Sequence, residues 1–283
     1  MMRKSYSVSL PGGGALEMGR RTLVVGVLNV TPDSFSDGGQ YDQPERAVEH
    51  ALRMQADGAD VIEVGGESTR PGAAPLSASA ELTRIAPVLK ELGKRLSLPI
   101  AIDTYKSEVA RAALDLGAAI INDVSALRFD PEVANVAAGA RAALVLMHMR
   151  GEPATMQKVA PSADIFAEIE RDLNIALTEA EARGVGRDQI ILDPGIGFGK
   201  TAEQNLALLN RLDRFASFDL PLMIGVSRKR FIGALTGRGE GERVFGTAAA
   251  VAASILRGAH IVRVHDVGEI VDVVRVTDAI LSA

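Results

Sequence analysis

The stretch IILDPGIGFGKTAEQ, residues 190–204, decides the fold because it joins a strand, a loop and a helix start in one short run. Residues 190–192 form an apolar run of strand length, followed by Asp193 and closely spaced glycines. Residues 201–204 match the S/T-x-x-E/Q capping box that begins a helix. The stretch therefore predicts a strand, a glycine-rich loop and a helix. The inward face of that helix is expected to carry Leu206, Leu209 and Leu212.

Apolar runs of this kind recur along the chain. They are rich in Val, Ile and Leu and do not alternate with polar residues, which is typical of parallel strands buried on both faces. The runs are 23–28, 61–64, 100–102, 120–121, 143–147, 190–192, 222–226 and 261–264. Amphipathic segments lie between them. One of these, 164–183, has apolar residues at helical spacing and ends before Gly184, which predicts a helix with a glycine after its end.

Eight strands alternating with helices over about 250 residues indicate a (β/α)8 barrel. A doubly wound sheet is the alternative, because alternation alone does not show whether the sheet closes. We expect a single domain over residues 1–283, since no linker or repeat divides the chain. Residues 1–20 differ from the rest. Apolar and polar residues alternate there on both sides of Pro11 and three glycines, which predicts a β-hairpin that covers the floor of the barrel.

Composition narrows the range of functions. Lys and Arg total 31 against 36 Asp and Glu, a net charge of −5 that favours neither a nucleic-acid groove nor an anionic membrane surface as partner. The absence of cysteine excludes disulfides, thiolate metal sites and a cysteine nucleophile. No apolar run approaches the roughly 18–20 residues of a membrane span, and no apolar segment follows Arg3 and Lys4. We therefore expect a cytoplasmic protein without a signal peptide.

Polar side chains follow nearly every predicted strand on its C-terminal side. In a barrel these strand ends meet on one face, where the active sites of this fold lie. A single Asp or Asn there would be expected to cap a turn or a helix, but capping does not require Lys, Arg and His as well. We therefore expect an active site. The set comprises Asn29, Glu63, Glu67, Thr69, Arg70, Asp103, Asn122, Asp123, His148, Asp193, Ser227, Arg228, Lys229, Arg263 and His265.

Three loop and histidine features refine this expectation. The loops 31–39 and 65–72 are long and glycine-rich, and Phe35 in the first is an aromatic side chain suited to covering a ligand. The loop 193–201 is similar to a phosphate-binding P-loop, but that motif requires glycine where this chain has Pro194, so nucleotide hydrolysis is not predicted. His148 and His265 have no close carboxylate set in the sequence, which argues against a metal held by protein ligands alone.

The polar set divides into two groups by chemistry. The first suits a phosphate or diphosphate, with Mg²⁺ joining through the amide oxygen of Asn29. The second suits a flat, nitrogen-rich heterocycle. No nucleophile–base pair is evident, so the predicted reaction is ionisation of an activated diphosphate, with cations stabilising the leaving group and carboxylates the positive ring. The first group is Asn29, Thr69, Arg70, Arg263 and His265, and the second is Asp103, Asn122, Asp193 and Lys229.

Seven motifs carry a resemblance to a known family. In chain order they are GVLNVTPDSFSDGG (26–39), GGESTRPG (65–72), IDT (102–104), IND (121–123), DPGIGFGK (193–200), SRK (227–229) and RVHDV (263–267). Each motif alone is weak, whereas the ordered set over nearly the whole chain is specific. At these positions the sequence resembles the dihydropteroate synthase family of pterin-binding enzymes.

The resemblance implies a pterin-binding (β/α)8 barrel that joins 6-hydroxymethyl-7,8-dihydropterin diphosphate to para-aminobenzoate. It also implies Mg²⁺, a homodimer, and loss of diphosphate before attack by the amine. Asp103, Asn122, Asp193 and Lys229 would hold the pterin. Asn29 would bind Mg²⁺ and, with Thr69, Arg70, Arg263 and His265, the diphosphate. Phe35, Pro71, Ser227 and Lys229 would line the para-aminobenzoate site, with Ser227 at a helix start. The residues implied in catalysis are Asp103, Asp193, Lys229 and Arg263.

Two alternatives stay open on the sequence. A corrinoid-linked methyltransferase uses a related barrel, but it would bind a folate and would have no need for the anion-binding pair Arg263 and His265. A non-catalytic pterin-binding paralogue is the second alternative. The presence of Asn29, Phe35 and the two long loops argues for an enzyme.

Overall fold

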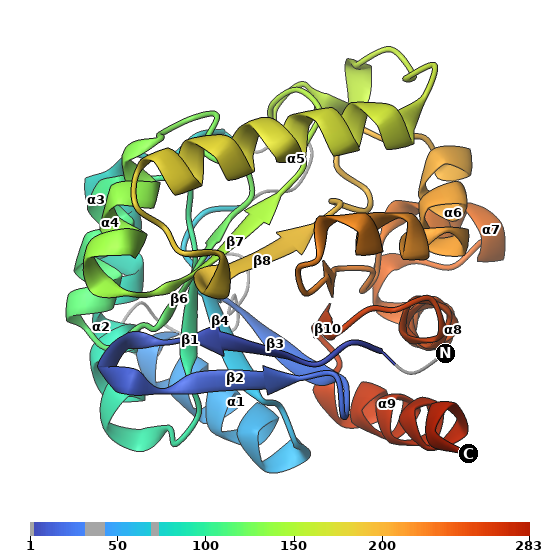
Figure 1. The fold of residues 1–283 in the computed structure, drawn as a ribbon. Helices are drawn as coiled ribbons and strands as arrows, with labels where there is room; N and C mark the ends of the chain where they lie inside the picture. The colour runs from blue at the N-terminus through green and yellow to red at the C-terminus, as the bar shows by residue number, and fades with distance from the viewer. Residues whose placement is uncertain (1–2, 32–42, 69–73) are drawn as a thin grey trace.

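An eight-stranded parallel sheet forms the centre of the computed structural model, which describes residues 3–31, 43–68 and 74–283 (Figure 1). The strands follow one another in chain order from β3 to β8, and β10 pairs with both β3 and β9. A bridge between Leu192 and Leu222 joins the two ends of the sheet. The (β/α)8 barrel is therefore confirmed over the doubly wound sheet. The strands are β3 (Leu23–Asn29), β4 (Val61–Gly65), β5 (Ile100–Asp103), β6 (Ile120–Asp123), β7 (Ala143–Met147), β8 (Ile190–Asp193), β9 (Met223–Ile224) and β10 (Ile261–Val264).

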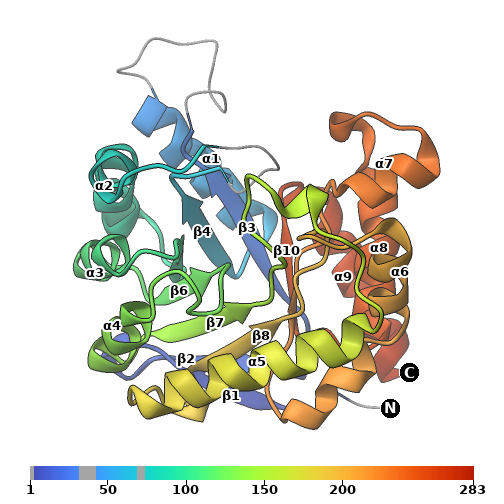
Figure 2. The same cartoon turned by 90° about the horizontal axis from the view of Figure 1, so that it is seen from above.

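Helices surround the ring of strands (Figure 2). The α-helices are α1 (Gln43–Asp57), α2 (Ala78–Arg95), α3 (Ser107–Asp115), α4 (Glu132–Ala140), α5 (Ile165–Ala182), α6 (Ala202–Asn210), α7 (Arg230–Thr236), α8 (Val244–Leu256) and α9 (Val267–Ser282). The 3-10 helices are η1 (Pro11–Gly13), η3 (Met156–Lys158), η4 (Arg187–Gln189), η5 (Leu212–Phe218) and η6 (Glu240–Glu242). In the described parts of the chain, no helix is long and apolar enough to cross a membrane.

The capping signals of the sequence are confirmed. Asp164 caps α5 by accepting hydrogen bonds from the backbone N–H groups of Phe166 and Ala167, both at 3.1 Å, and Gly184 after the helix has φ +89°. Thr201 and Gln204 form a reciprocal capping box at the start of α6. The α6 N-terminus therefore lies where the sequence predicts it.

The predicted inward face of α6 is partly wrong. Leu206 is 40% exposed, whereas Asn205, Leu208 and Leu209 are buried. Asn205 takes an inward position because its amide oxygen accepts from Gly197 N at 2.7 Å and its amide nitrogen donates to Thr201 O at 2.8 Å. The polar side chain of Asn205 thus faces inward, and Leu206, which was expected there, faces solvent.

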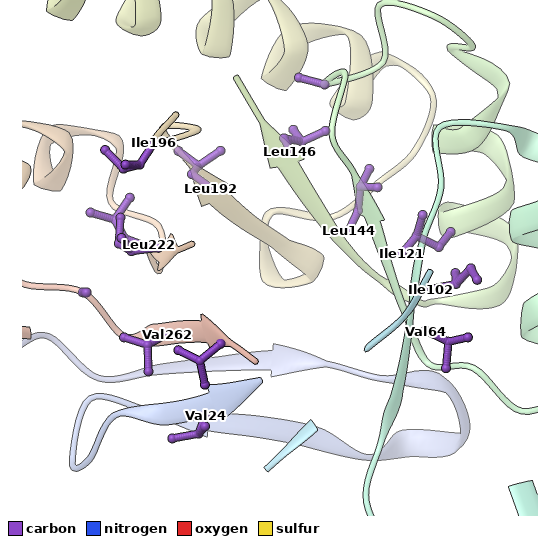
Figure 3. Packing of buried hydrophobic residues seen from close by; sticks show 14 of the residues in the cluster. Val24, Val64, Ile102, Ile121, Leu144, Leu146, Leu192, Ile196, Leu222 and Val262 are labelled. Atoms are coloured by element: carbon purple, nitrogen blue, oxygen red, sulfur yellow. The ribbon is translucent and has the colours of Figure 1, made fainter. Parts of the chain in front are cut away.

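The barrel strands carry two sets of apolar side chains, one inside the barrel and one facing the helices. Because side chains alternate along a strand, one residue of each neighbouring pair points into the barrel and the other points toward the helices. The outward set packs under the helices (Figure 3) and includes Val24, Val64, Ile102, Ile121, Leu144, Leu146, Leu192 and Val262. The inward set forms the lower part of the barrel and includes Val25, Val61, Ala101, Ile120, Val145, Ile191 and Ile261.

The predicted N-terminal hairpin is present and covers the floor of the barrel. β1 (Tyr6–Ser9) and β2 (Ala15–Met18) pair antiparallel, with Val8 opposite Leu16. Val8, Leu10, Leu16 and Met18 are buried in the same cluster as the inward-pointing apolar residues of the barrel. The hairpin lies across the end of the barrel at which the strands begin (Figure 1). It therefore excludes water from the lower layer.

The hairpin should contribute measurably to stability. Met18→Ala removes a side chain that is 2% exposed, so we expect the free energy of unfolding to fall by about 2–4 kcal/mol. Glu17→Ala on the opposite, solvent-facing side of β2 is the matched control and should change it by less than about 0.5 kcal/mol. Urea denaturation of both variants tests this. Equal losses of unfolding free energy in the two variants would show that the buried face of the hairpin stabilises the protein no more than the exposed face.

Candidate active site

The upper inward layer of the barrel is polar. In five strands the residue two positions after a floor residue also points inward and is charged or an amide. These residues are Glu63, Asp103, Asn122, Asp193 and Arg263. All but Glu63 line a cavity at the C-terminal ends of the strands, together with Lys229 and an apolar wall of Val124, Met147, Ile196 and Phe198. The structure thus brings together the four residues that the sequence grouped for a heterocycle, with Arg263 beside them.

Arg263 links two buried carboxylates. Its Nε donates to Glu63 Oε1 at 2.6 Å, and its Nη2 lies 2.9 Å from Asp103 Oδ2. Glu63 is 1% exposed and Asp103 8% exposed. Although burial opposes the charged form, Glu63 and Asp103 raise the pKa of Arg263 above its ordinary value. The guanidinium therefore stays charged and holds both carboxyl groups in place.

Two buried oxygens of the cavity lining have no hydrogen-bond partner among the described residues. They are Asp103 Oδ1 and Asn122 Oδ1. Asp103 and Asn122 are register partners on the adjacent strands β5 and β6, so the two side chains that carry these acceptors are neighbours. Burial, with the nearby Glu63 carboxylate, raises the pKa of Asp103 to about 8. A buried acceptor without a partner is costly, so this pair is suited to a ligand that offers adjacent N–H donors.

Asp193 and Lys229 complete the polar wall. Asp193 ends β8, and its Oδ1 accepts from Gly195 N at 2.7 Å. Burial raises the pKa of Asp193 to about 6. Burial also lowers the pKa of Lys229 to about 8, and the charge of Arg263 adds to this. Lys229 Nζ lies 4.0 Å from the centre of the Phe198 ring, which places a cation over the apolar part of the wall.

Ser227 and His265 contact each other at the rim. Ser227 Oγ accepts from His265 N at 3.2 Å and lies 3.0 Å from His265 Nδ1. Burial lowers the pKa of His265 to about 3, so at pH 7 it is a neutral hydrogen-bonding group and not a cation. Lys229 is the residue before α7, so Ser227 precedes the helix and does not stand at its start as predicted.

Asn29 lies beside Asp103, across Gly65. The register pairs Asn29 with Gly65 and Gly65 with Asp103 on three consecutive strands. A Cβ on Gly65 would come 3.7 Å from Asn29 Oδ1 and 3.6 Å from Asp103 Cβ. Because glycine leaves this space open, an amide oxygen and a carboxylate flank it. Hard oxygen donors of this kind fit Mg²⁺, which uses few protein ligands together with water and phosphate oxygens.

Four of the predicted site residues fall outside the described parts of the chain. They are Phe35 in the first long loop and Thr69, Arg70 and Pro71 in the second. Their roles remain predictions. The described residue Glu67, which precedes three of them, accepts a hydrogen bond from Tyr105 Oη at 2.8 Å and also pairs with Lys106.

The prediction that His148 lacks nearby carboxylates is wrong. Glu168 and Asp172 lie one turn apart on α5, which packs over the end of β7, and they bring potential ligand atoms within 4.8 Å of His148 and of each other. Arg150 Nε donates to Glu168 at 2.6 Å, and Arg171 lies 2.8 Å from Asp172. The carboxylates are therefore already paired with cations, which opposes binding of a divalent ion.

The side chain of Asp123 does not share the orientation of its neighbour Asn122. Its side chain points away from the cavity, and its carboxylate accepts from the backbone N–H groups of Ser125 at 2.8 Å and Leu127 at 2.7 Å. Asp123 thus holds the turn after β6. For Asp123, the turn-capping interpretation of a strand-end residue is the right one.

Sequence reasoning gave no specific role to two buried charged residues. Glu63 was only one member of the polar set, although a carboxylate inside the apolar run VIEVG is itself a signal. Lys200 ends the motif DPGIGFGK, but the sequence assigns it no role of its own. Its Nζ lies 2.8 Å from Gly195 O, and 3.2 Å from both His148 O and Phe198 O. Lys200 therefore ties the loop after β8, which carries cavity residues, to the end of β7.

Comparison with known proteins agrees with this geometry. A family model described as pterin binding enzyme matches residues 25–265. A dihydropteroate synthase of Synechocystis is 46% identical, over 96% of this chain and 94% of the relative. The Xanthomonas albilineans dihydropteroate synthase with 4-aminobenzoic acid is 42% identical with a TM-score of 0.91, covering 99% of this chain and 100% of the other.

A further structure of the Xanthomonas enzyme is a complex with 7,8-dihydropteroate, with a TM-score of 0.84 at 40% identity, over 93% of this chain and 95% of the other. The Yersinia pestis enzyme, in complex with a sulfonamide drug, has a TM-score of 0.91 at 39% identity, over 98% of this chain and 100% of the other. Barrel and cavity thus define a pterin-binding enzyme. The chain belongs to the dihydropteroate synthase family, whose members are transferases of folate synthesis.

Asp103 should make stability depend on pH. Its pKa in the folded protein, about 8, lies above the ordinary value of 3.8, so the folded state keeps a proton that the unfolded state releases. The stabilisation is present below pH 4 and is lost as pH rises toward 8. Asp103→Asn cannot ionise and should therefore be more stable than the parent protein at pH 8, with the difference shrinking toward pH 4.

Urea denaturation of the two proteins at pH 4.5 and pH 8 measures this difference. Asp213→Asn, at an exposed position of η5, controls for the loss of one carboxylate elsewhere. A gain for Asp103→Asn that is the same at both pH values would contradict the raised pKa.

Proposed function

We propose that this protein condenses 6-hydroxymethyl-7,8-dihydropterin diphosphate with para-aminobenzoate, giving 7,8-dihydropteroate and diphosphate. The observation that carries the proposal is the pair of adjacent buried acceptors, Asp103 Oδ1 and Asn122 Oδ1, in a cavity that also holds Asp193 and Lys229. The pyrimidine edge of a pterin carries an amino group beside a ring N–H, which matches two adjacent acceptors. The relatives with 4-aminobenzoic acid and 7,8-dihydropteroate support the same pair of substrates.

Each substrate part has its own residues in this proposal. Asp103, Asn122, Asp193 and Lys229 bind the pterin, and the apolar wall with Phe198 covers its ring. Arg263, His265 and Asn29, with Thr69 and Arg70, bind the diphosphate. Ser227 and Lys229, with Phe35 and Pro71, line the place for para-aminobenzoate. The contact between Ser227 and His265 supports a diphosphate site and a para-aminobenzoate site that lie side by side, as a direct transfer requires.

The reaction proceeds by loss of the leaving group first. The bond between the pterin methylene carbon and the diphosphate oxygen breaks, and the electron pair leaves with the diphosphate, which Arg263 stabilises. The positive charge left on the pterin is stabilised by Asp103 and Asp193. The amine of para-aminobenzoate then forms the new C–N bond and loses a proton to solvent. An aromatic amine is neutral at pH 7, so the site needs to position it and requires no general base.

Mg²⁺ fits the anion end of the site. Asn29 would hold it, beside the space that Gly65 leaves open. When bound, the ion supplies positive charge to the oxygens of the diphosphate. The protein's own contribution there is a charged Arg263 and the hydrogen-bonding group of His265.

The decisive experiment is a diphosphate-release assay with Mg²⁺ and the pterin diphosphate, run with and without para-aminobenzoate, with the product identified by mass. We expect release that depends on para-aminobenzoate and yields dihydropteroate. Asp103→Asn should lower kcat/KM at least 100-fold, because it removes a carboxylate that faces the ring. Asp213→Asn is the exposed control and should behave like the parent protein. Binding of the pterin with no release under either condition would indicate the non-catalytic paralogue.

We also propose that the protein acts in the cytoplasm as a homodimer, with residues 1–283 forming one pterin-binding domain. Two large apolar side chains on the neighbouring helices α7 and α8 support a second copy as the partner. Leu235 is 63% exposed and Phe245 86% exposed. Exposed apolar groups on neighbouring helices can form an association surface, and a two-fold axis would pair this surface with itself.

Phe245→Asp should convert the dimer to a monomer, because it puts a charge into the proposed interface. Light scattering on the purified protein measures the mass. Ile175→Asp is the matched control, since Ile175 is 63% exposed on α5, and it should leave the mass unchanged. A monomeric parent protein, or a Phe245→Asp variant that stays dimeric, would rule out this interface.

A further inference from the structure

We infer that Glu63 is a positioning residue of this site. It orients the Asn122 amide so that the oxygen, and not the nitrogen, faces the bound heterocycle. The identity of that heterocycle as a pterin rests on the proposed function. Glu63 itself has no contact with the cavity. Asn122 borders both the cavity and an apolar space beneath it, whereas Glu63 borders only the lower space. Glu63 therefore acts from behind the site.

The contact that orients Asn122 is short and fully buried. Asn122 Nδ2 donates to Glu63 Oε2 at 2.9 Å, with Asn122 2% exposed and Glu63 1% exposed. A side-chain amide has a donor end and an acceptor end of nearly equal shape, so packing alone does not choose between its two orientations. A carboxylate has only acceptors. The reverse orientation would place two acceptors against each other in a buried space and leave both without a donor.

Arg263 fixes the orienting group in turn. Glu63 Oε1 accepts from Arg263 Nε at 2.6 Å, so the two carboxylate oxygens have separate tasks. One neutralises the guanidinium and the other directs the amide. The guanidinium also pairs with Asp103 Oδ2, at 2.9 Å. Both free oxygens of the cavity, Asp103 Oδ1 and Asn122 Oδ1, are therefore presented by one connected chain of contacts that runs through Glu63 and Arg263.

This chain predicts what a glutamine at position 63 would do. Arg263 offers only donors, so the amide oxygen of the new side chain must face Arg263 and its NH2 group must face Asn122. Asn122 then has to turn its own oxygen toward that NH2. Its nitrogen would face the cavity, and a donor would replace an acceptor where the ligand offers N–H. Glu63→Gln should therefore invert the hydrogen-bonding character of a residue that it does not replace.

A second substitution should reverse the effect. In Glu63→Gln/Asn122→Asp, the carboxylate at 122 accepts from the NH2 group at 63 with one oxygen and keeps the other as an acceptor at the cavity. The pair has exchanged its amide and its carboxylate, so shape and net charge equal those of the parent protein. We expect Glu63→Gln to weaken binding roughly 30-fold and the double variant to return within about threefold of the parent.

The test is calorimetric titration of pteroic acid into the parent protein, Glu63→Gln, Asn122→Asp and the double variant at pH 8, with thermal unfolding of each as a check on folding. Recovery in the double variant supports the inference, because a purely structural role of Glu63 would not be restored by changing Asn122. Unchanged affinity in Glu63→Gln, or a double variant as weak as the single one, would overturn it. No binding to the parent protein would instead count against the proposed function.

Discussion

The ion-pair contacts of Arg263 with Glu63 and Asp103 are the constraint on which the rest of the site depends. A charged group taken out of water is tolerated only when partners surround it, and here a guanidinium meets two carboxyl groups inside a barrel. The Glu63 charge on β4 disfavours ionisation of Asp103 on β5, and the guanidinium from β10 opposes this effect. Because β3 lies between β10 and β4, the Arg263 guanidinium reaches both carboxyl groups only when these strands are assembled in one sheet.

The polar layer is possible because the layers beneath and around it are apolar. The inward residues two positions earlier on each strand are apolar, and the N-terminal hairpin seals them from water. Outward residues of the same strands pack under the helices. The apolar layers supply the stability, so the site can keep two buried acceptors that the described residues leave without a donor. Buried acceptors without a donor destabilise the folded protein until a ligand donates hydrogen bonds to them. Such a cost in stability is expected at a binding site.

The site is selective because its hydrogen-bonding groups are fixed before a ligand arrives. Asp103 and Asn122 stand on adjacent strands, and each is held from behind by a partner that leaves one oxygen free. Lys229 over the Phe198 ring adds a cation at the apolar side. Asp103 and Asn122 stand on strands, which are rigid, so their geometry does not depend on the closure of a loop.

From the sequence alone, the strands, the hairpin, the helix caps and the face on which Asp103, Asn122, Asp193, Lys229 and Arg263 meet can be predicted, but strand–helix alternation leaves open whether the sheet closes. The bridge between Leu192 and Leu222 in the tertiary structure joins its ends into a barrel. Strand periodicity, capping boxes and strand-end residues are local patterns, so they can be recognised from residues that are close in the sequence. Only the tertiary structure decided that Asn122 faces the cavity while Asp123 holds a turn, that Asn205 and not Leu206 is buried, and that α5 brings two carboxylates to His148. It also revealed Glu63 behind Asn122. These outcomes depend on hydrogen bonds between residues distant in the chain, whose geometry exists only once the strands and helices have packed.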